Sequence, residues 1–295
     1  MVCCHVDQQP AVLSNLAQRY AAFARTFIGQ SAARSRPFFL YVPFSHVHQL
    51  CAPTRGQWAS SAFVNASGVG PFGDAVMEMD WITGEVMDEI ATRQLIPTTL
   101  VLWTSDDGPW TAEQQMAGSV GPFHARWFAE HAPAACYACP AEFAHKPTAS
   151  RPARCVCAAT PWSAARELDG IPCGLDVGLG STWEANLRMP AIARWQGRIS
   201  PGSSSLELVS TLDVLPTLLS LVGVEPPRRV LDGVDISHIL LESPPTGATA
   251  NRSLFFWRDR APHLTRPSLF AVKIGRYKAH LWTKSATGPD IAVRR

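Results

Sequence analysis

The 295-residue chain lacks a long uncharged apolar run, and its charges nearly balance. Residues 206–223 form the most apolar stretch, but they contain Glu207, Asp213 and a proline, which argues against a membrane span. The net charge is only +2, which gives no electrostatic footprint for nucleic acid or for an anionic membrane. We therefore expect a soluble protein that binds no nucleic acid and has no transmembrane segment.

The first ten residues have neither the basic region nor the apolar region of a secretory signal. This feature taken alone indicates the cytosol, but Asn65 and Asn251 each begin an Asn-x-Ser pattern that is typical of glycosylation acceptors. The eight cysteines are compatible with disulfides and do not require them. The sequence therefore leaves the compartment unknown.

Apolar side chains recur every three or four residues over 10–30 and again over 72–93, which predicts two amphipathic helices. In the second helix the acidic side chains should lie opposite the apolar stripe. Short apolar runs at 37–42 and 98–104 predict buried strands. The order helix, strand, helix, strand is typical of an α/β fold with a parallel sheet.

Periodicity is lost from about 124 to 170, where alanine, proline, arginine and cysteine dominate. We interpret these residues as an insertion, a disordered segment or non-authentic coding sequence, because structureless loops of this length are uncommon. Cysteine pairs at 136 and 139 and at 155 and 157 could suggest zinc. The close spacing of the second pair and the lack of flanking elements argue against it.

Order returns with a predicted strand at 189–195 and a helix that contains Asp213 and Pro216. Residues 268–282 alternate in polarity around Gly275-Arg276, which predicts a β-hairpin. We therefore expect a larger α/β domain over 1–245, with the irregular insertion at about 124–170, and a small antiparallel subdomain over 246–295.

Asp106 and Asp107 directly follow the predicted strand 98–104 and precede Gly108-Pro109. Two adjacent carboxylates repel each other unless a cation lies between them, and calcium or magnesium takes oxygen ligands of this kind. An aspartate that caps the following turn is the alternative interpretation. Both interpretations remain open on the residues alone.

His46 and His48 follow the predicted strand 37–42 and lie two residues apart. On an extended segment both side chains point the same way, so they could reach one anion or one metal, whereas a packed core histidine is the alternative. In open parallel sheets ligands bind at the carboxyl ends of strands. The His46–His48 loop and the Asp106–Asp107 loop should therefore face one crevice.

Six segments resemble, in this order, the C-terminal part of the sulfatase family, of the arylsulfatase A type. They are RPFFLYVPFSHVH, GPFGDAVMEMDWITGEVMDEI, TTLVLWTSDDGPW, GSTWEANLRMPAIARWQGRI, VSTLDVLPTLLSLVG and LFAVKIGRYKAH. The resemblance implies an alkaline-phosphatase-like α/β domain, with a parallel-rich sheet flanked by helices, and then a small antiparallel C-terminal subdomain. It also implies sulfate-ester hydrolysis by a cysteine-derived formylglycine, with calcium, or magnesium in its place, binding the sulfate.

The resemblance also assigns roles to residues. Asp106 matches the aspartate ligand of the family's S/T-D-N-G motif, and Asp107 stands where that motif has asparagine. His48 matches the last histidine of the family's H-x-H, which hydrogen-bonds the sulfate ester, so His48 is the catalytic candidate and His46 with His48 the substrate-binding pair. The implied substrate is a sulfated small molecule or glycolipid, the implied compartment is lysosomal or secreted, and a homo-oligomer is compatible with it.

Several positions depart from the family pattern. The family's first metal pair, an Asp-Asp followed by Gly, has no counterpart in this sequence. Leu179 stands where the G-K-G-x-T-x-E-G-G motif has lysine, and Ala185 and Asn186 stand for its last two glycines. One sulfate-binding cation is therefore replaced by an apolar side chain, and Asp107 adds a negative charge beside an anionic substrate.

Cys51 begins the sequence C-A-P-T-R, which fits the core of the formylglycine signature. In sulfatases that signature lies far upstream of H-x-H, whereas here it follows it, so we interpret Cys51 as an ordinary loop cysteine. We expect this chain to lack the nucleophile region. The alternative function is a catalytically inactive sulfatase-like module that binds an anion or a partner, and a phosphoesterase would need two full metal clusters.

Overall fold

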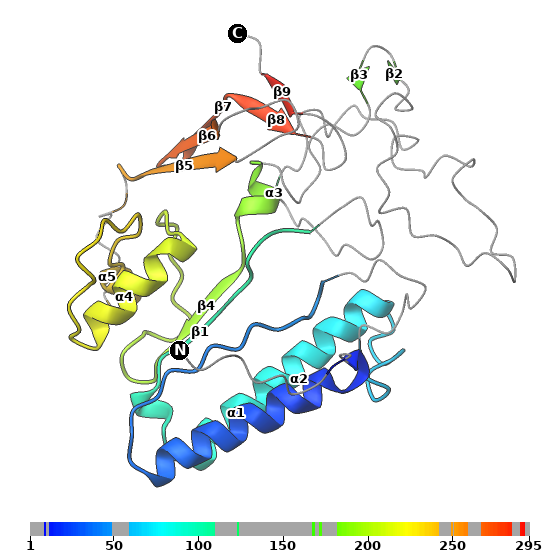
Figure 1. Cartoon of the computed structure of the whole chain (residues 1–295), viewed down its shortest axis with the longest axis vertical. Helices are drawn as coiled ribbons and strands as arrows, with labels where there is room; N and C mark the ends of the chain where they lie inside the picture. The colour runs from blue at the N-terminus through cyan, green and yellow to red at the C-terminus, as the bar shows by residue number, and fades with distance from the viewer. Residues whose placement is uncertain are drawn as a thin grey trace, which may run out of the picture. The chain divides into compact units, whose positions relative to one another are not determined.

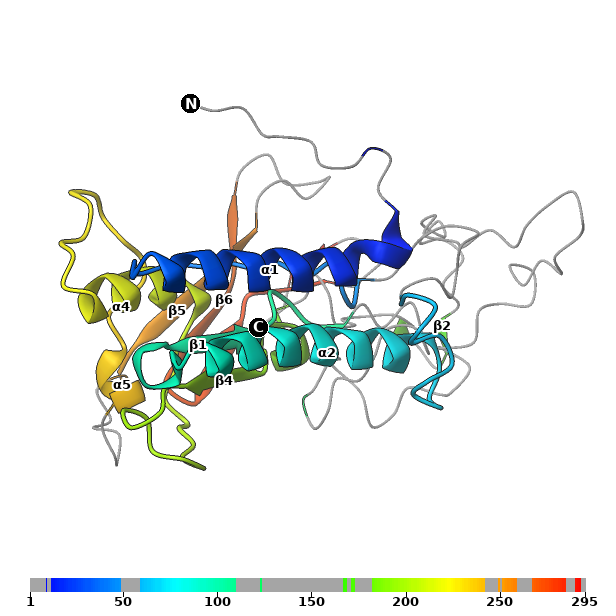
Figure 2. The same cartoon turned by 90° about the horizontal axis from the view of Figure 1, so that it is seen from below.

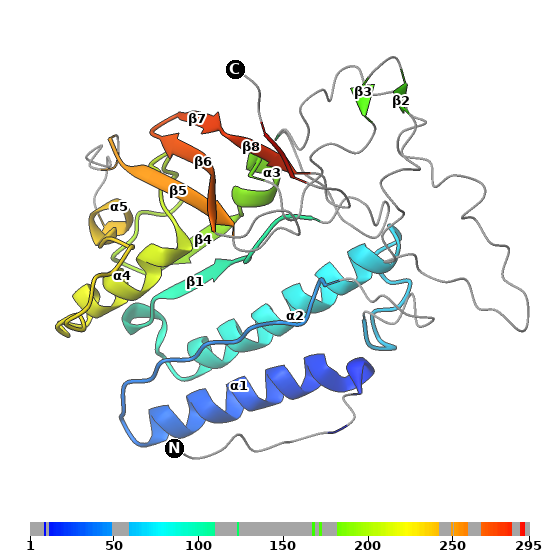
Figure 3. The ribbon, with the colours of Figure 1, turned by 45° about the horizontal axis from the view of Figure 1, so that its top comes forward.

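The structure, a computed structural model, divides into two compact units, shown in Figures 1 to 3. Among the described residues the first unit runs to Ile96 and the second begins at Pro97. Side chains are described for 12–48, 59–109, 182–241, 251–257 and 267–281, with Gln9, Phe123 and Thr249, and the backbone also for 167–168, 171–172, 258, 282–284 and 290–292.

The first unit is built on two long helices, α1 (Leu16–Ala33) and α2 (Pro71–Thr92), and a single turn of 3-10 helix, η1 (Leu13–Asn15), leads into α1. Both predicted helices are confirmed. They lie side by side and run in the same direction (Figure 2). The buried stripe of α1 consists of small side chains and one isoleucine, namely Ala17, Ala21, Ala24 and Ile28.

The sequence pattern predicts that the acidic residues of α2 lie opposite its apolar stripe. The structure differs, because three of them are buried. Asp74, Glu78 and Glu89 are buried, whereas Val76 and Met77 are exposed. Each buried acid has hydrogen-bonding partners, which offset the cost of leaving water. Asp74, for example, accepts hydrogen bonds from the backbone N–H groups of Ser67 and Asn65, which lower the pKa of its carboxyl.

The predicted strand at 37–42 is wrong, because these residues form no strand in the structure. The segment runs back along the helices (Figure 3), with Phe38 packed edge-on against Phe27 at a centroid distance of 6.1 Å. Alternate side chains point outward, and Phe39 and Tyr41 are 73% and 75% exposed. A short apolar run indicates burial, but a strand also needs a hydrogen-bonding neighbour, which the run does not specify.

In the second unit, β1 (Val101–Thr104) follows a 3-10 turn, η2 (Ile96–Thr98), and pairs with β4 (Ala191–Arg194). The predicted strands 98–104 and 189–195 are thus confirmed over shorter ranges. Their pairing is antiparallel, as is every strand pair in the described part of the chain. The parallel pairing that the order of elements predicts is not formed there, because 37–42 is not a strand.

A three-stranded antiparallel sheet follows, formed by β5 (Ser253–Arg258), β6 (Ser268–Ile274) and β7 (Tyr277–His280). The predicted hairpin is confirmed, with Ile274 opposite Tyr277 and Gly275 at a positive φ of 52°. Two further pairs join β2 (Glu167–Leu168) to β3 (Ile171–Pro172) and β8 (Trp282–Lys284) to β9 (Asp290–Ala292).

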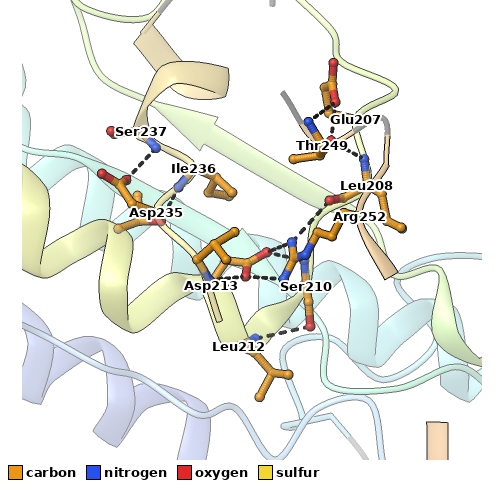
Figure 4. Close-up of polar contacts among 12 residues, drawn as sticks. Glu207, Leu208, Ser210, Leu212, Asp213, Asp235, Ile236, Ser237, Thr249 and Arg252 are labelled. Carbon is orange, nitrogen blue, oxygen red and sulfur yellow. Dashed lines mark hydrogen bonds and ion pairs between the residues drawn. The ribbon is translucent and has the colours of Figure 1, made fainter. Parts of the chain in front are cut away.

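Asp213 ends η6 (Thr211–Asp213), which leads into α4 (Val214–Leu221), and its buried carboxylate ties this turn to Arg252 before β5 and to Val234 before α5 (Ser237–Leu241). The predicted helix thus begins at Val214, directly after Asp213. Figure 4 shows that Asp213 faces the guanidinium of Arg252, whose Nη1 and Nη2 donate at 2.5 and 2.6 Å. The backbone N–H groups of Ser210 and Val234 donate to the same carboxylate.

None of the helices in the described part of the chain combines the length and the apolar character that a bilayer crossing requires.

Candidate active site

The two candidate histidines lie on a turn that follows the extended segment, where the His48 N–H donates to the Ser45 carbonyl at 3.3 Å. Their environments differ. The His46 side chain is only 4% exposed and donates through Nε2 to Glu78 Oε2 at 3.0 Å, whereas His48 is exposed. The two imidazoles are thus not presented together to solvent, because the buried carboxylate of Glu78 holds the first one.

The Glu78 carboxylate gathers two chain segments on α2. Its Oε2 also accepts the backbone N–H of Ser60 at 2.9 Å, and its side chain is 1% exposed. Three further polar atoms of this group are buried without a hydrogen-bond partner: His46 Nδ1, Ser60 Oγ and Glu78 Oε1. Such atoms are unusual in protein interiors and each one needs an explanation.

Asp106 and Asp107 lie on the loop after β1, and both are exposed. The loop is fixed from behind. The Gly108 N–H donates to Asn186 Oδ1 at 3.4 Å, and a Cβ atom at Gly108 would lie 2.2 Å from the Ala185 carbonyl oxygen. Only glycine fits that approach, so the loop keeps its place and the two carboxylates face outward.

Ala185 and Asn186 belong to α3 (Glu184–Leu187), the short helix at the end of the sequence GSTWEAN. Glu184 forms ion pairs with Lys273 at 2.8 Å and with Lys278 at 2.6 Å. Burial works to raise the pKa of Glu184, but the hydrogen bonds from Lys273 and Lys278 outweigh it and lower that pKa. These contacts fasten α3, and with it the Asp106–Asp107 loop, to the C-terminal sheet.

His280 completes this cluster. Its ring stacks on Trp183 with centroids 4.1 Å apart, and its Nδ1 lies 3.0 Å from Thr182 Oγ1. Burial and then the nearby Lys278 charge lower the pKa of His280 to about 4. The imidazole is therefore neutral at pH 7.

Sequence reasoning singled out neither Glu78 nor His280. The signal for Glu78 was present, since it lies four residues from both Asp74 and Ile82 and so shares the buried face of α2. His280 gave no such signal, because the alternation groups it with Lys278 as polar, whereas in β7 these two residues are half-buried and Tyr277 is exposed.

Several predicted features lie outside the described residues, among them Cys51, Leu179 and the cysteines within 124–170. Among the residues that are described, no group of three or more His, Cys, Asp or Glu side chains could hold a metal ion. The His46–His48 turn and the Asp106–Asp107 loop belong to different units, so the crevice they should share stays a prediction.

Comparisons with known proteins agree on one family. The sulfatase family model matches residues 6–224, and the model of the C-terminal region of N-sulphoglucosamine sulphohydrolase matches residues 181–288. Human arylsulfatase A is 33% identical over 97% of this chain and 44% of its own length. Arylsulfatase G of Rattus norvegicus is 30% identical over 98% of this chain and 45% of its own.

The fold points the same way. The crystal structure of the PsFucS1 sulfatase from Pseudoalteromonas sp. matches with a TM-score of 0.67 at 22% identity, over 95% of this chain and 44% of that one. The chain belongs to the sulfatase family, and it spans a little under half the length of the curated relatives named above.

Proposed function

We propose that this chain serves sulfuric ester hydrolysis of the arylsulfatase type, with His48 and the Asp106–Asp107 loop as its share of the active site. The observation that carries the proposal is the exposed pair of carboxylates, held outward on a loop whose backbone is fixed by Gly108 and Asn186. Membership of the sulfatase family supports the type of reaction.

In this proposal His48 contacts the sulfate ester. Its imidazole is exposed and lies on a turn that is anchored at its first two residues, at Ser45 by Tyr20 and at His46 by Glu78. An imidazole beside the ester can donate a hydrogen bond to the leaving oxygen or act as a general acid there. We assign the nucleophile to none of the described residues.

Asp106 and Asp107 would hold the calcium ion, or magnesium in its place. The donor set fits in kind, because carboxylate oxygens are the ligands that these hard cations take, and it supplies part of the coordination shell. A bound cation offsets the negative charge of the sulfate oxygens. The substrate class is a sulfated small molecule or glycolipid, and we expect a lysosomal or secreted protein that can form homo-oligomers.

A catalytically inactive module that binds an anion or a partner is the second candidate. Substitutions favour it, since Leu179 replaces a sulfate-binding lysine of the family and Asn186 is a buried amide where the family has glycine. Both candidates use the same loop and the same histidine, so they differ only in turnover.

Calorimetric titration of the chain with calcium tests the shared part of the two candidates. We expect binding that Asp106→Asn and Asp107→Asn each weaken, while Asp80→Asn, which removes an exposed acid of α2, leaves it unchanged. Assay with 4-nitrophenyl sulfate then separates the candidates. Turnover that His48→Ala abolishes supports the hydrolase and contradicts the expected lack of a nucleophile region, binding without turnover supports the module, and absence of both contradicts the proposal.

A further inference from the structure

We infer that Glu78 is a positioning residue, which orients the exposed imidazole of His48 toward the sulfate group by holding His46. The inference rests on the proposed function, in which His48 contacts the sulfate ester. It adds Glu78, to which the resemblance assigns no role, to the residues on which that contact depends.

The geometry places Glu78 at the point where two segments meet α2. One carboxylate oxygen, Oε2, accepts from His46 Nε2 at 3.0 Å and from the Ser60 N–H at 2.9 Å. His48 is two residues from His46 on the same turn, and its own N–H closes that turn on Ser45. A change at Glu78 must therefore reach the backbone that carries His48.

The Glu78 carboxylate also determines which ring nitrogen of His46 carries the proton. An ionised carboxylate only accepts hydrogen bonds, so the ring nitrogen that faces it must carry the proton. In the neutral imidazole the proton is then on Nε2, and Nδ1 is a bare acceptor. Glu78→Gln conserves the side-chain volume and keeps one acceptor oxygen. It also places an N–H group where the second carboxylate oxygen was, so the preference for this His46 tautomer is lost.

The buried atoms without partners provide a second argument. A carboxylate that serves stability alone is expected to be saturated, because every unpaired buried oxygen costs free energy. Glu78 Oε1 and the neighbouring Ser60 Oγ and His46 Nδ1 are all buried without a partner. A cost of this kind is typical of functional sites, where it is retained for the sake of position.

The experiment uses the whole chain with ¹³C,¹⁵N-labelled histidine, followed by NMR of the imidazole signals. His48→Ala and His46→Gln assign the two rings. Inorganic sulfate is the probe, titrated into the unmodified chain, Glu78→Gln and the matched control Glu85→Gln. Glu85 lies on the same helix and pairs with the exposed Arg25, so its substitution removes an equal charge without touching the His46–His48 turn.

We expect sulfate to shift the His48 signal of the unmodified chain. Glu78→Gln should move that signal already in the free chain and weaken sulfate binding about fivefold, the effect of one lost hydrogen bond. Glu85→Gln should do neither. If Glu78→Gln fails to fold, His46→Ala, which leaves no donor for Glu78, breaks the same contact from the other side and should move the His48 signal in the same way.

An unchanged His48 signal and unchanged sulfate affinity in folded Glu78→Gln overturn the inference. Failure of the proposed function looks different, because sulfate then leaves the His48 signal of the unmodified chain where it is. In that case the comparison of the free chains still decides whether Glu78 positions His48.

Discussion

The carboxylates of Asp213 in the second unit and Glu78 in the first are both buried, but they differ in the hydrogen bonds that they accept. Asp213 accepts two hydrogen bonds from Arg252 and two from backbone N–H groups, whereas Glu78 has both of its hydrogen bonds on one oxygen. A buried carboxylate that accepts hydrogen bonds on both oxygens is typical of a residue that stabilises the fold. Incomplete saturation beside a histidine indicates a residue retained for function.

The largest effect is expected from Arg252→Ala. Removing the guanidinium leaves the Asp213 charge buried without its counter-ion, which costs about 3–5 kcal/mol of unfolding free energy. Urea unfolding measures it. Arg276→Ala, which removes an exposed arginine of the β6–β7 turn, is the control and should stay within about 0.5 kcal/mol. Equal losses in the two variants would contradict a structural role for the Asp213–Arg252 pair.

The next effect concerns pH. The pKa of His280 is about 4 in the folded chain and ~6.5 when unfolded, so between these values the unfolded state binds more protons. Stability should therefore fall as the pH drops from about 6.5 to 4, by roughly 1–2 kcal/mol after allowing for solvent screening.

His280→Gln should remove this part of the slope. The measurement is the unfolding free energy of both chains at several pH values, and the quantity to compare is their difference, because the carboxylates titrate in both. A difference that does not change with pH would be incompatible with a buried neutral His280.

Glu78→Gln should cost less than Arg252→Ala, about 1 kcal/mol in urea unfolding. The amide keeps an acceptor oxygen for the Ser60 N–H, so one of the two hydrogen bonds of Glu78 can persist. A loss as large as that of Arg252→Ala would show that Glu78, like Asp213, serves mainly to stabilise the fold.

The smallest effect on stability is expected at the outward side chains of the 37–42 segment. Replacing Phe39 and Tyr41 by serine removes little packing, so unfolding free energy should change by less than about 0.5 kcal/mol. Self-association, measured by light scattering, should nevertheless decrease, because extended segments with exposed aromatic side chains are prone to pair with other chains. Unchanged scattering would show that this segment does not mediate self-association.

Much of the fold could be predicted from periodicity, because α1, α2 and the β6–β7 hairpin bury one face against their own unit. Strand pairing could not be predicted in this way. An apolar run such as 37–42 indicates burial, but it does not specify the neighbouring strand that would supply the hydrogen bonds. The acids of α2 were misplaced for a related reason. Hydropathy treats Glu78 as a surface residue, whereas its burial depends on His46 and Ser60, which are distant in sequence.

The candidate site was predicted in part. The positions of Asp106 and Asp107 after a strand were correctly inferred, and the structure adds the reason that their loop keeps its place, which is the close approach of Gly108 to α3. The shared orientation of His46 and His48 was inferred from an extended backbone, and the turn at 45–48 with its buried carboxylate replaces that geometry.

The alanine stripe of α1 has a consequence for how the chain tolerates mutation. Ala17, Ala21 and Ala24 are at most 3% exposed, so any larger side chain there has to push the neighbouring helices or segments apart. A scan of all substitutions in α1 would therefore show a narrow line of intolerance between permissive outward positions such as Phe23. Substitutions that accumulate during evolution should therefore fall at those outward positions, whereas the buried alanines of α1 should stay unchanged.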